Sequence, residues 1–237
     1  MKIKTKVIYY EKEKNPDTNY TTVIVDILRA SSSITTLLSN GALWVKPVMS
    51  IEEAFNIKEK SPDVLLAGEK NALKIEGFDF GNSPTEFLNN DFKGKKIVLT
   101  TTNGTKAVLN HRDNFEVLIG CFLNINALID YLKIRENILL VCSGSHGEFS
   151  LEDFLFCGRL IVNLTKNCNV ESMDDASKLA LKAAQLLGNE LLPYAKESMH
   201  AKVLVSKGFE KDVDFCLKEN VFSTIPILTD EGFKTLN

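Results

Sequence analysis

The sequence lacks the features that mark several large classes of protein. Its 237 residues contain no uninterrupted apolar run of about 18 residues, so we expect no membrane-spanning helix and no membrane partner. The first residues show no apolar core or cleavage site of a signal peptide, and we expect a cytoplasmic protein. Internal repeats and low-complexity tracts are also missing. We therefore expect one domain over residues 1–237, with a helical C-terminal subdomain from about residue 170 as the alternative.

An excess of positive charge is missing as well. The chain has 28 Lys and Arg against 31 Asp and Glu, and its lysines are scattered, which argues against a nucleic-acid partner. The five cysteines are widely spaced and form no CxxC pair, so we expect free structural thiols rather than a zinc or redox motif. No GxGxxG follows the first strand-like segments, which argues against a dinucleotide-dependent dehydrogenase.

What the sequence does contain is a regular alternation of strand-like and helix-like segments. Short runs rich in Val, Ile and Leu are bounded by polar or glycine-containing stretches, and capping boxes begin at Ser50 and Ser83. This alternation predicts an α/β fold with a largely parallel or mixed sheet covered by helices on both sides. The predicted strands are Lys4–Tyr10, Thr22–Ile27, Trp44–Val48, Val64–Ala67, Lys96–Thr100, Val117–Cys121 and Ile138–Cys142.

The later part of the chain is predicted to be mainly helical. Segments Asn124–Lys133 and Ser150–Asn163 have helical patterns, and so do Asp174–Leu187 and Ala201–Leu217. Only Thr224–Leu228 has the pattern of a strand in the final third.

Acidic residues follow or face the ends of several predicted strands, where ligands of open α/β sheets bind. Asp26 ends one apolar run and precedes Arg29 and Ser31, while Glu69 follows another run and Asp153 lies at a helix start. Carboxylates there suggest a bound cation, because a buried acid is costly unless it is paired. Simpler roles stay open: Asp26 could cap a helix or pair with Arg29, Glu69 could lie in a surface turn, and Asp153 could form a capping pair.

A polar loop follows the predicted strand Lys96–Thr100 and precedes a helix-like stretch. Hydroxyls, an amide and a glycine at a helix start suit a small anion such as phosphate, although a simple Thr-rich turn would have the same sequence. The helix start at Asn82 and Ser83 is a second candidate anion site. The loop residues are Thr101, Thr102, Asn103, Gly104 and Thr105.

Taken together, these loops predict metal-assisted transfer of a phosphoryl group to water. Hard carboxylate oxygens from Asp26, Glu69 and Asp153 suit Mg²⁺, which usually keeps waters and a substrate phosphate among its ligands. Arg29 and the threonine-rich loop would neutralise the phosphoryl group. A nucleophilic Asp26 is the alternative to attack by water, but Leu28 stands where phosphatases with a DxD pair have their second acid.

The chain also resembles a known family, the 2-phosphosulfolactate phosphatases of coenzyme M biosynthesis. The resemblance covers about residues 7–228 and follows the motif order of the family. It is carried by VDILRASSSITTLLSNGA, PVMSIEEA, LLAGE, GFDFGNSP, TTNGTKAV, FLNINAL, VCSGSHGEFSLED, SKGFEKDVDFC and IPIL, while Ser198-Met199-His200 loosely follows a Ser-x-His pattern.

The resemblance implies a Mg²⁺-dependent acid phosphatase with a three-layer α/β/α fold that hydrolyses (R)-2-phospho-3-sulfolactate to 3-sulfolactate and phosphate. It also favours a homodimer or larger homo-oligomer. The family's motif residues fall on Asp26, Arg29, Ser31, Glu69, Asn82, Ser83, Thr101, Thr102, Asn103, Gly104, Thr105, Glu152 and Asp153.

Two questions about function stay open at this point. The substrate could be another small phosphorylated hydroxy acid, or the chain could bind a small anion without catalysis. The sulfonate and carboxylate of the substrate also need a cationic or amide-rich receptor, for which Asn82, Ser83, Lys106 and Arg159 are candidates.

Overall fold

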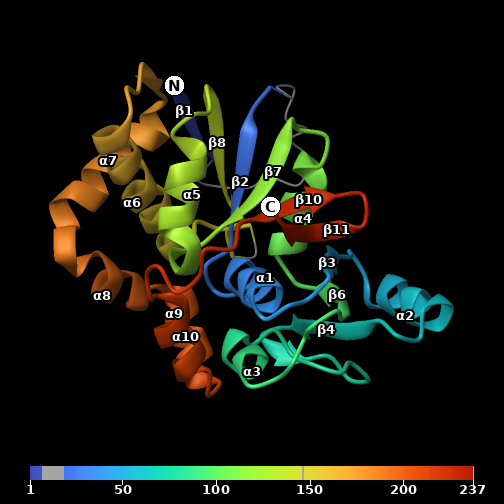
Figure 1. The fold of residues 1–237 in the computed structure, drawn as a ribbon. Helices are drawn as coiled ribbons and strands as arrows, with labels where there is room; N and C mark the ends of the chain where they lie inside the picture. Colours follow the sequence, from blue (N-terminus) through green and yellow to red (C-terminus); the bar gives the residue numbers. More distant parts are fainter. Residues whose placement is uncertain (7–18, 146, 237) are drawn as a thin grey trace.

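The computed structural model describes residues 1–6, 19–145 and 147–236, and its centre is one mixed β-sheet (Figure 1). The strand order in the described part is β5-β4-β6-β3-β11-β10-β7-β2-β8-β1-β9. The strands are β1 (Lys2–Lys6), β2 (Thr21–Val25), β3 (Trp44–Pro47), β4 (Leu65–Lys70), β5 (Leu73–Lys74), β6 (Lys96–Thr100), β7 (Glu116–Gly120), β8 (Asn137–Cys142), β9 (Ser172–Met173), β10 (Pro226–Thr229) and β11 (Gly232–Thr235).

A C-terminal hairpin separates two parallel groups of strands in this sheet. Strands β4, β6 and β3 are mutually parallel, and so are β7, β2, β8, β1 and β9. The hairpin β10–β11 lies between the groups and pairs antiparallel to β7 through Ile227 and Leu118, and to β3 through Phe233 and Val45. Because three successive antiparallel pairings connect β7 to β3, the two groups run in opposite directions, and the carboxyl ends of β2 and of β4 and β6 do not share one edge of the sheet.

Helices cover both faces of the sheet. In β2, Val23 and Val25 contribute to one hydrophobic core while Ile24 contributes to another, as expected when alternate side chains point to opposite faces. The helices in the described part are α1 (Ala30–Ser39), α2 (Ile51–Lys60), α3 (Pro84–Leu88), α4 (Gly104–His111), α5 (Ile125–Leu132), α6 (Leu151–Asn167), α7 (Asp175–Leu187), α8 (Leu191–Lys196), α9 (Met199–Ser206) and α10 (Glu210–Cys216). Short 3₁₀ turns lie at Phe122–Asn124 and Gly188–Glu190.

The C-terminal helices form a continuous run that begins on α6. Helix α7 packs closely on α6 because Gly158 has no side chain: a Cβ built there would lie 2.3 Å from the carbonyl oxygen of Ala180. The chain then continues through α8 and α9 to α10, which packs against α3 (Figure 1). This run brings a segment near residue 200 beside the carboxyl ends of the strands.

The structure confirms the predicted α/β class with a largely parallel sheet, and most predicted strands lie within a few residues of observed ones. The prediction Lys4–Tyr10 corresponds to β1 at Lys2–Lys6, and its residues 7–10 lie outside the described residues. The prediction of one helix over Ala201–Leu217 is wrong, because Gly208 has a φ of 87° and separates α9 from α10. Strand β11 was not predicted, since its four residues give too short a pattern.

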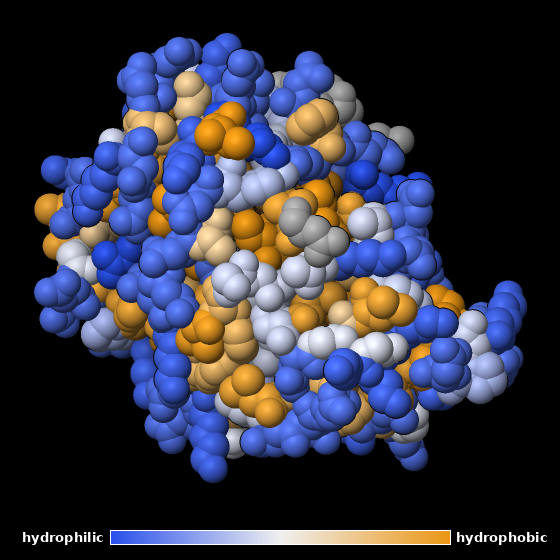
Figure 2. All heavy atoms as spheres, in the orientation of Figure 1, coloured by the Kyte–Doolittle hydropathy of each residue, from blue (hydrophilic) through white to orange (hydrophobic). Residues whose placement is uncertain are grey.

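The surface of this face is mostly hydrophilic at its periphery, whereas apolar and weakly polar side chains gather near its centre and over α9 (Figure 2). Met199 and Val203 on α9 are 77% and 41% exposed. In the part of the chain that the structure describes, no helix is both long and apolar enough to cross a membrane.

Candidate functional site

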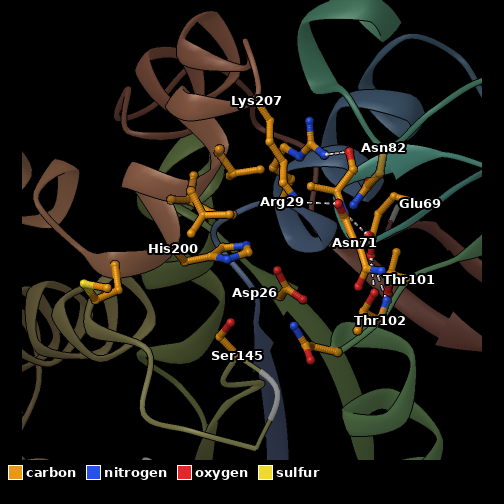
Figure 3. A pocket seen from close by; sticks show the side chains of 16 residues that line it. Asp26, Arg29, Glu69, Asn71, Asn82, Thr101, Thr102, Ser145, His200 and Lys207 are labelled. Atoms are coloured by element: carbon orange, nitrogen blue, oxygen red, sulfur yellow. Dashed lines mark hydrogen bonds between the residues drawn. The ribbon is translucent and has the colours of Figure 1, made fainter.

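A cavity of about 410 Å³ opens where the two groups of parallel strands meet the C-terminal helices (Figure 3). Its volume is typical of a site for a small organic ligand. Strand-end loops form one wall and α9 forms the opposite wall. The lining residues are Asp26, Leu28, Arg29, Glu69, Asn71, Ala72, Asn82, Thr101, Thr102, Asn103, Ser145, Met199, His200, Val203, Leu204 and Lys207.

Asp26 follows β2 and lies at the base of the cavity. Its side chain is buried, and its Oδ1 accepts a hydrogen bond from the Ala30 N–H of α1 at 3.1 Å. Ser31 supports the same turn, because its Oγ accepts the Asp26 N–H at 2.9 Å. Burial, together with the nearby charges of Glu69 and Glu152, raises the pKa of Asp26 to about 7. This carboxyl group can therefore change its protonation state near neutral pH.

Glu69 lies at the end of β4 and is held by the threonine-rich loop. Its Oε1 accepts hydrogen bonds from both the N–H and the hydroxyl of Thr102, each at 2.8 Å. Its Oε2 accepts the Ala72 N–H at 2.7 Å, across the tip of the β4–β5 hairpin. The loop predicted to receive an anion thus already binds one, which is a carboxylate of the same chain.

Arg29 lines the cavity but is held from behind by Asp212 of α10. Its Nη1 donates to Asp212 Oδ2 at 2.6 Å, and both side chains are 2% exposed. Its Nη2 donates to the carbonyl of Ala72 at 2.9 Å, and the guanidinium lies 4.1 Å from the ring centroid of Phe209. The other oxygen of Asp212 accepts the Ser83 hydroxyl at 2.8 Å. These contacts fix the guanidinium and neutralise much of its charge.

Two further acids, Glu152 and Asp153, are buried near Asp26 but do not line the cavity. Asp153 Oδ1 accepts the Ile27 N–H at 2.9 Å, so this carboxyl group supports the loop that follows β2. Burial and the charges of Glu152 and Asp26 raise the pKa of Asp153 well above its usual range. Glu152 Oε2 is buried and has no hydrogen-bond partner among the described residues. Carboxyl groups are therefore crowded together here, and their burial is poorly compensated by hydrogen bonds.

The predicted site residues divide into those that face the cavity and those that do not. Asp26, Arg29, Glu69, Asn82, Thr101, Thr102 and Asn103 line it. Ser83 caps α3, Gly104 begins α4, and the Thr105 hydroxyl lies 3.1 Å from that of Thr101. Among the four candidates for the acid groups of the substrate, only Asn82 lines the cavity. Ser83 and Lys106 do not, and Arg159 pairs instead with Glu219 at 3.1 Å.

Sequence reasoning did not place helix α9 or Asp212 in the site. His200 enters the cavity from the helix side, opposite the strand-end residues Asp26 and Glu69 (Figure 3). The Ser-x-His pattern at 198–200 and the stretch SKGFEKDVDFC, which contains Lys207, were the local signals for this wall. Asp212 belongs to the stretch SKGFEKDVDFC, but nothing in that stretch indicates its partner Arg29.

The donor set of the cavity suits Mg²⁺ shared with a substrate, rather than a metal held by protein alone. Among the residues that the structure describes, no three His, Cys, Asp or Glu side chains are grouped to hold a metal. Asp26 and Glu69 both face the cavity, however, and Mg²⁺ is usually bound through one or two carboxylates plus waters and substrate phosphate. The unpartnered Glu152 Oε2 adds negative potential that a cation would offset.

Comparisons with known proteins point to one family. A family model described as 2-phosphosulpholactate phosphatase matches residues 7–231. The chain is 46% identical over 213 residues to a probable 2-phosphosulfolactate phosphatase of Thermotoga petrophila, covering 90% of this chain and 91% of the relative. Proteins with the same name from Caldanaerobacter subterraneus and Clostridium acetobutylicum are 40% and 36% identical over 227 and 214 residues. These alignments cover 94% and 90% of this chain, and 91% of each relative.

The raised pKa of Asp26 predicts how stability depends on pH. The folded protein holds this proton more tightly than an unfolded chain, in which the pKa is near 3.8, so the contribution of Asp26 to the free energy of unfolding is greatest below that pH. Between about pH 4 and pH 7 the wild-type free energy of unfolding should fall, relative to Asp26→Asn, by on the order of 4 kcal/mol. Urea unfolding of both proteins across this range measures the difference, and parallel pH profiles would contradict the assignment.

The buried ion pair predicts a second effect on stability. Asp212→Asn leaves the Arg29 guanidinium buried without a charged partner, which should lower the free energy of unfolding by about 3 kcal/mol. Asp214→Asn on the same helix is the matched control, because its 2.6 Å pair with Lys196 is half-exposed and should contribute less than about 1 kcal/mol. Similar midpoints for the two variants in chemical denaturation would argue against the role given to Asp212.

Proposed function

The chain belongs to the 2-phosphosulfolactate phosphatase family, and we propose that it hydrolyses 2-phosphosulfolactate to 3-sulfolactate and inorganic phosphate with Mg²⁺ as its cofactor. The family and its relatives make it a phosphoric monoester hydrolase. We expect the phosphate of the substrate to bind beside the strand-end loops. This is best supported by one observation: Asp26, Glu69 and the loop Thr101–Asn103 lie together on one wall of the cavity. Ligands of open α/β sheets usually bind beyond the carboxyl ends of strands, where these residues lie.

In this proposal, Asp26 and Glu69 would hold the metal beside the phosphate. When bound, Mg²⁺ would neutralise phosphate charge and favour ionisation of an attacking water. Thr102 fixes the Glu69 carboxylate through two hydrogen bonds, so this ligand is already oriented toward the cavity. Arg29 would place its remaining N–H groups on the phosphoryl oxygens, since only one donor goes to Asp212 and one to Ala72.

We propose that water, rather than Asp26, attacks the phosphorus. A covalent route through an aspartyl phosphate needs a second acid to protonate the leaving oxygen, and position 28 supplies an apolar Leu28 that lines the cavity. The Oδ1 of Asp26 also accepts the Ala30 N–H, which orients the carboxylate as a fixed ligand.

The first test is the activity of the carboxylate variants. Asp26→Asn and Glu69→Gln should each lower Mg²⁺-dependent turnover of 2-phosphosulfolactate by about 100-fold or more, because each removes a charge that would hold the cation. Asp91→Asn, an exposed acid outside the cavity, is the control and should leave turnover unchanged. Phosphate release measured with and without Mg²⁺ shows whether each carboxylate is needed for metal-dependent turnover. Metal-independent binding with no turnover by the wild type would make the chain a non-catalytic anion binder instead.

The stereochemistry at phosphorus distinguishes the two mechanisms. One in-line attack by water inverts the configuration of a phosphate made chiral with oxygen isotopes, whereas two successive displacements through Asp26 retain it. We expect inversion, read from the isotopic pattern of the released phosphate. Retention would establish a covalent intermediate and leave the proposed substrate untouched.

A further inference from the structure

The cavity has a second wall whose chemistry differs from that of the strand-end loops. Five residues on one side of α9 and at its C-terminal end face the cavity, with the spacing of neighbouring helical turns. Met199, Val203 and Leu204 make this wall largely apolar, and His200 and Lys207 add polar nitrogens at its two ends. We call these five residues the α9 wall.

Positive charge available to a ligand is concentrated on the α9 wall. The other cation of the cavity, Arg29, is paired with the buried Asp212 at 2.6 Å. Lys207, in contrast, has no ion pair within the described residues, and its Nζ donates at 2.7 Å to the backbone carbonyl of Asn71. A carbonyl is a neutral acceptor, and a hydrogen bond to an anion is stronger, so a ligand acid group can compete for this ammonium.

The two walls therefore suit the two ends of one polyanionic molecule. The wall formed by the strand-end loops presents Asp26 and Glu69. These carboxylates repel a free anion and admit a phosphate only together with a cation. An acid group without a metal ion would be drawn instead to Lys207 and His200. The apolar Val203 and Leu204 lie between these two residues along the helix and suit a short carbon skeleton.

We propose that Lys207 and His200 form the subsite for the acid groups of the substrate that lie remote from its phosphate, and so determine specificity. This inference rests on the proposed function, because 2-phosphosulfolactate carries a carboxylate and a sulfonate in addition to the phosphate. The hairpin tip at Asn71 contributes by holding the Lys207 ammonium at the mouth of the cavity. A phosphomonoester that lacks a second acid group would not use this subsite.

Lysine variants on α9 test the proposal. Lys207→Met keeps the length of the side chain and removes its charge, and Lys202→Met is the matched control, since Lys202 is exposed on the same helix and does not line the cavity. For Lys207→Met, kcat/KM for 2-phosphosulfolactate should fall about tenfold or more, while kcat/KM for p-nitrophenyl phosphate should stay within about twofold. His200→Gln should show the same selectivity, and Lys202→Met should change neither value.

Equal losses on both substrates, or no loss on either, would overturn the subsite. Binding of 3-sulfolactate, measured by calorimetry, provides a readout that needs no turnover. Its affinity should fall about tenfold in Lys207→Met and be unchanged in Lys202→Met. If the wild type hydrolyses no phosphomonoester, the proposed function fails, whereas the subsite is supported by this binding difference and contradicted by its absence.

Discussion

The buried pair of Arg29 and Asp212 is the interaction on which the geometry of the cavity depends. It joins residues 183 positions apart, at the start of α1 and in α10. Arg29 also holds the carbonyl of Ala72 at the tip of the β4–β5 hairpin, and Asp212 also accepts the hydroxyl of Ser83 at the start of α3. Four segments around the cavity are thus fixed to one pair of charges, and removing either charge would leave the other unpaired in the interior.

The second constraint is the hairpin β10–β11, which separates the two parallel groups of strands. Its three antiparallel pairings make the two groups run in opposite directions. Helix α1 begins beside Asp26 and leads the chain from β2 across the hairpin to β3. The cavity therefore lies where the strand order changes, which is the usual position of a ligand site in an open α/β sheet.

Local sequence could predict the strand-end wall because its residues follow apolar runs directly. Asp26 and Thr102 follow buried strands and Glu69 lies near the end of β4, so each could be placed at the carboxyl end of a strand. The opposite directions of the two groups of strands, which the hairpin β10–β11 sets, could not be predicted in this way. The α9 wall could not be found in this way, because Lys207 reaches the site only through the packing of α6 to α10. The role of Arg29 was also incompletely predicted. Neither the periodicity of apolar residues nor the spacing of motifs along the sequence indicates a partner as distant as Asp212.

The buried carboxyl groups crowded near the end of β2 lower the stability of the folded protein. In the proposed function, this destabilisation argues for a bound cation. Asp26 and Asp153 both have raised pKa values, chiefly through burial, and Glu152 leaves one oxygen without a partner in the described structure. A chain under selection for stability alone would replace such residues with apolar ones. A divalent cation between Asp26 and Glu69 would offset the repulsion.

The threonine-rich loop supports the same argument. Thr102 uses its N–H and its hydroxyl on the Glu69 carboxylate, so those two donors are already occupied by an anion of the chain itself. A phosphate entering beside Glu69 would meet a negative charge instead of two unused donors. The loop therefore acts first by orienting a carboxylate. In the proposed function, the phosphate would be attracted by the cation that this carboxylate would hold, and Arg29 would supply direct hydrogen bonds.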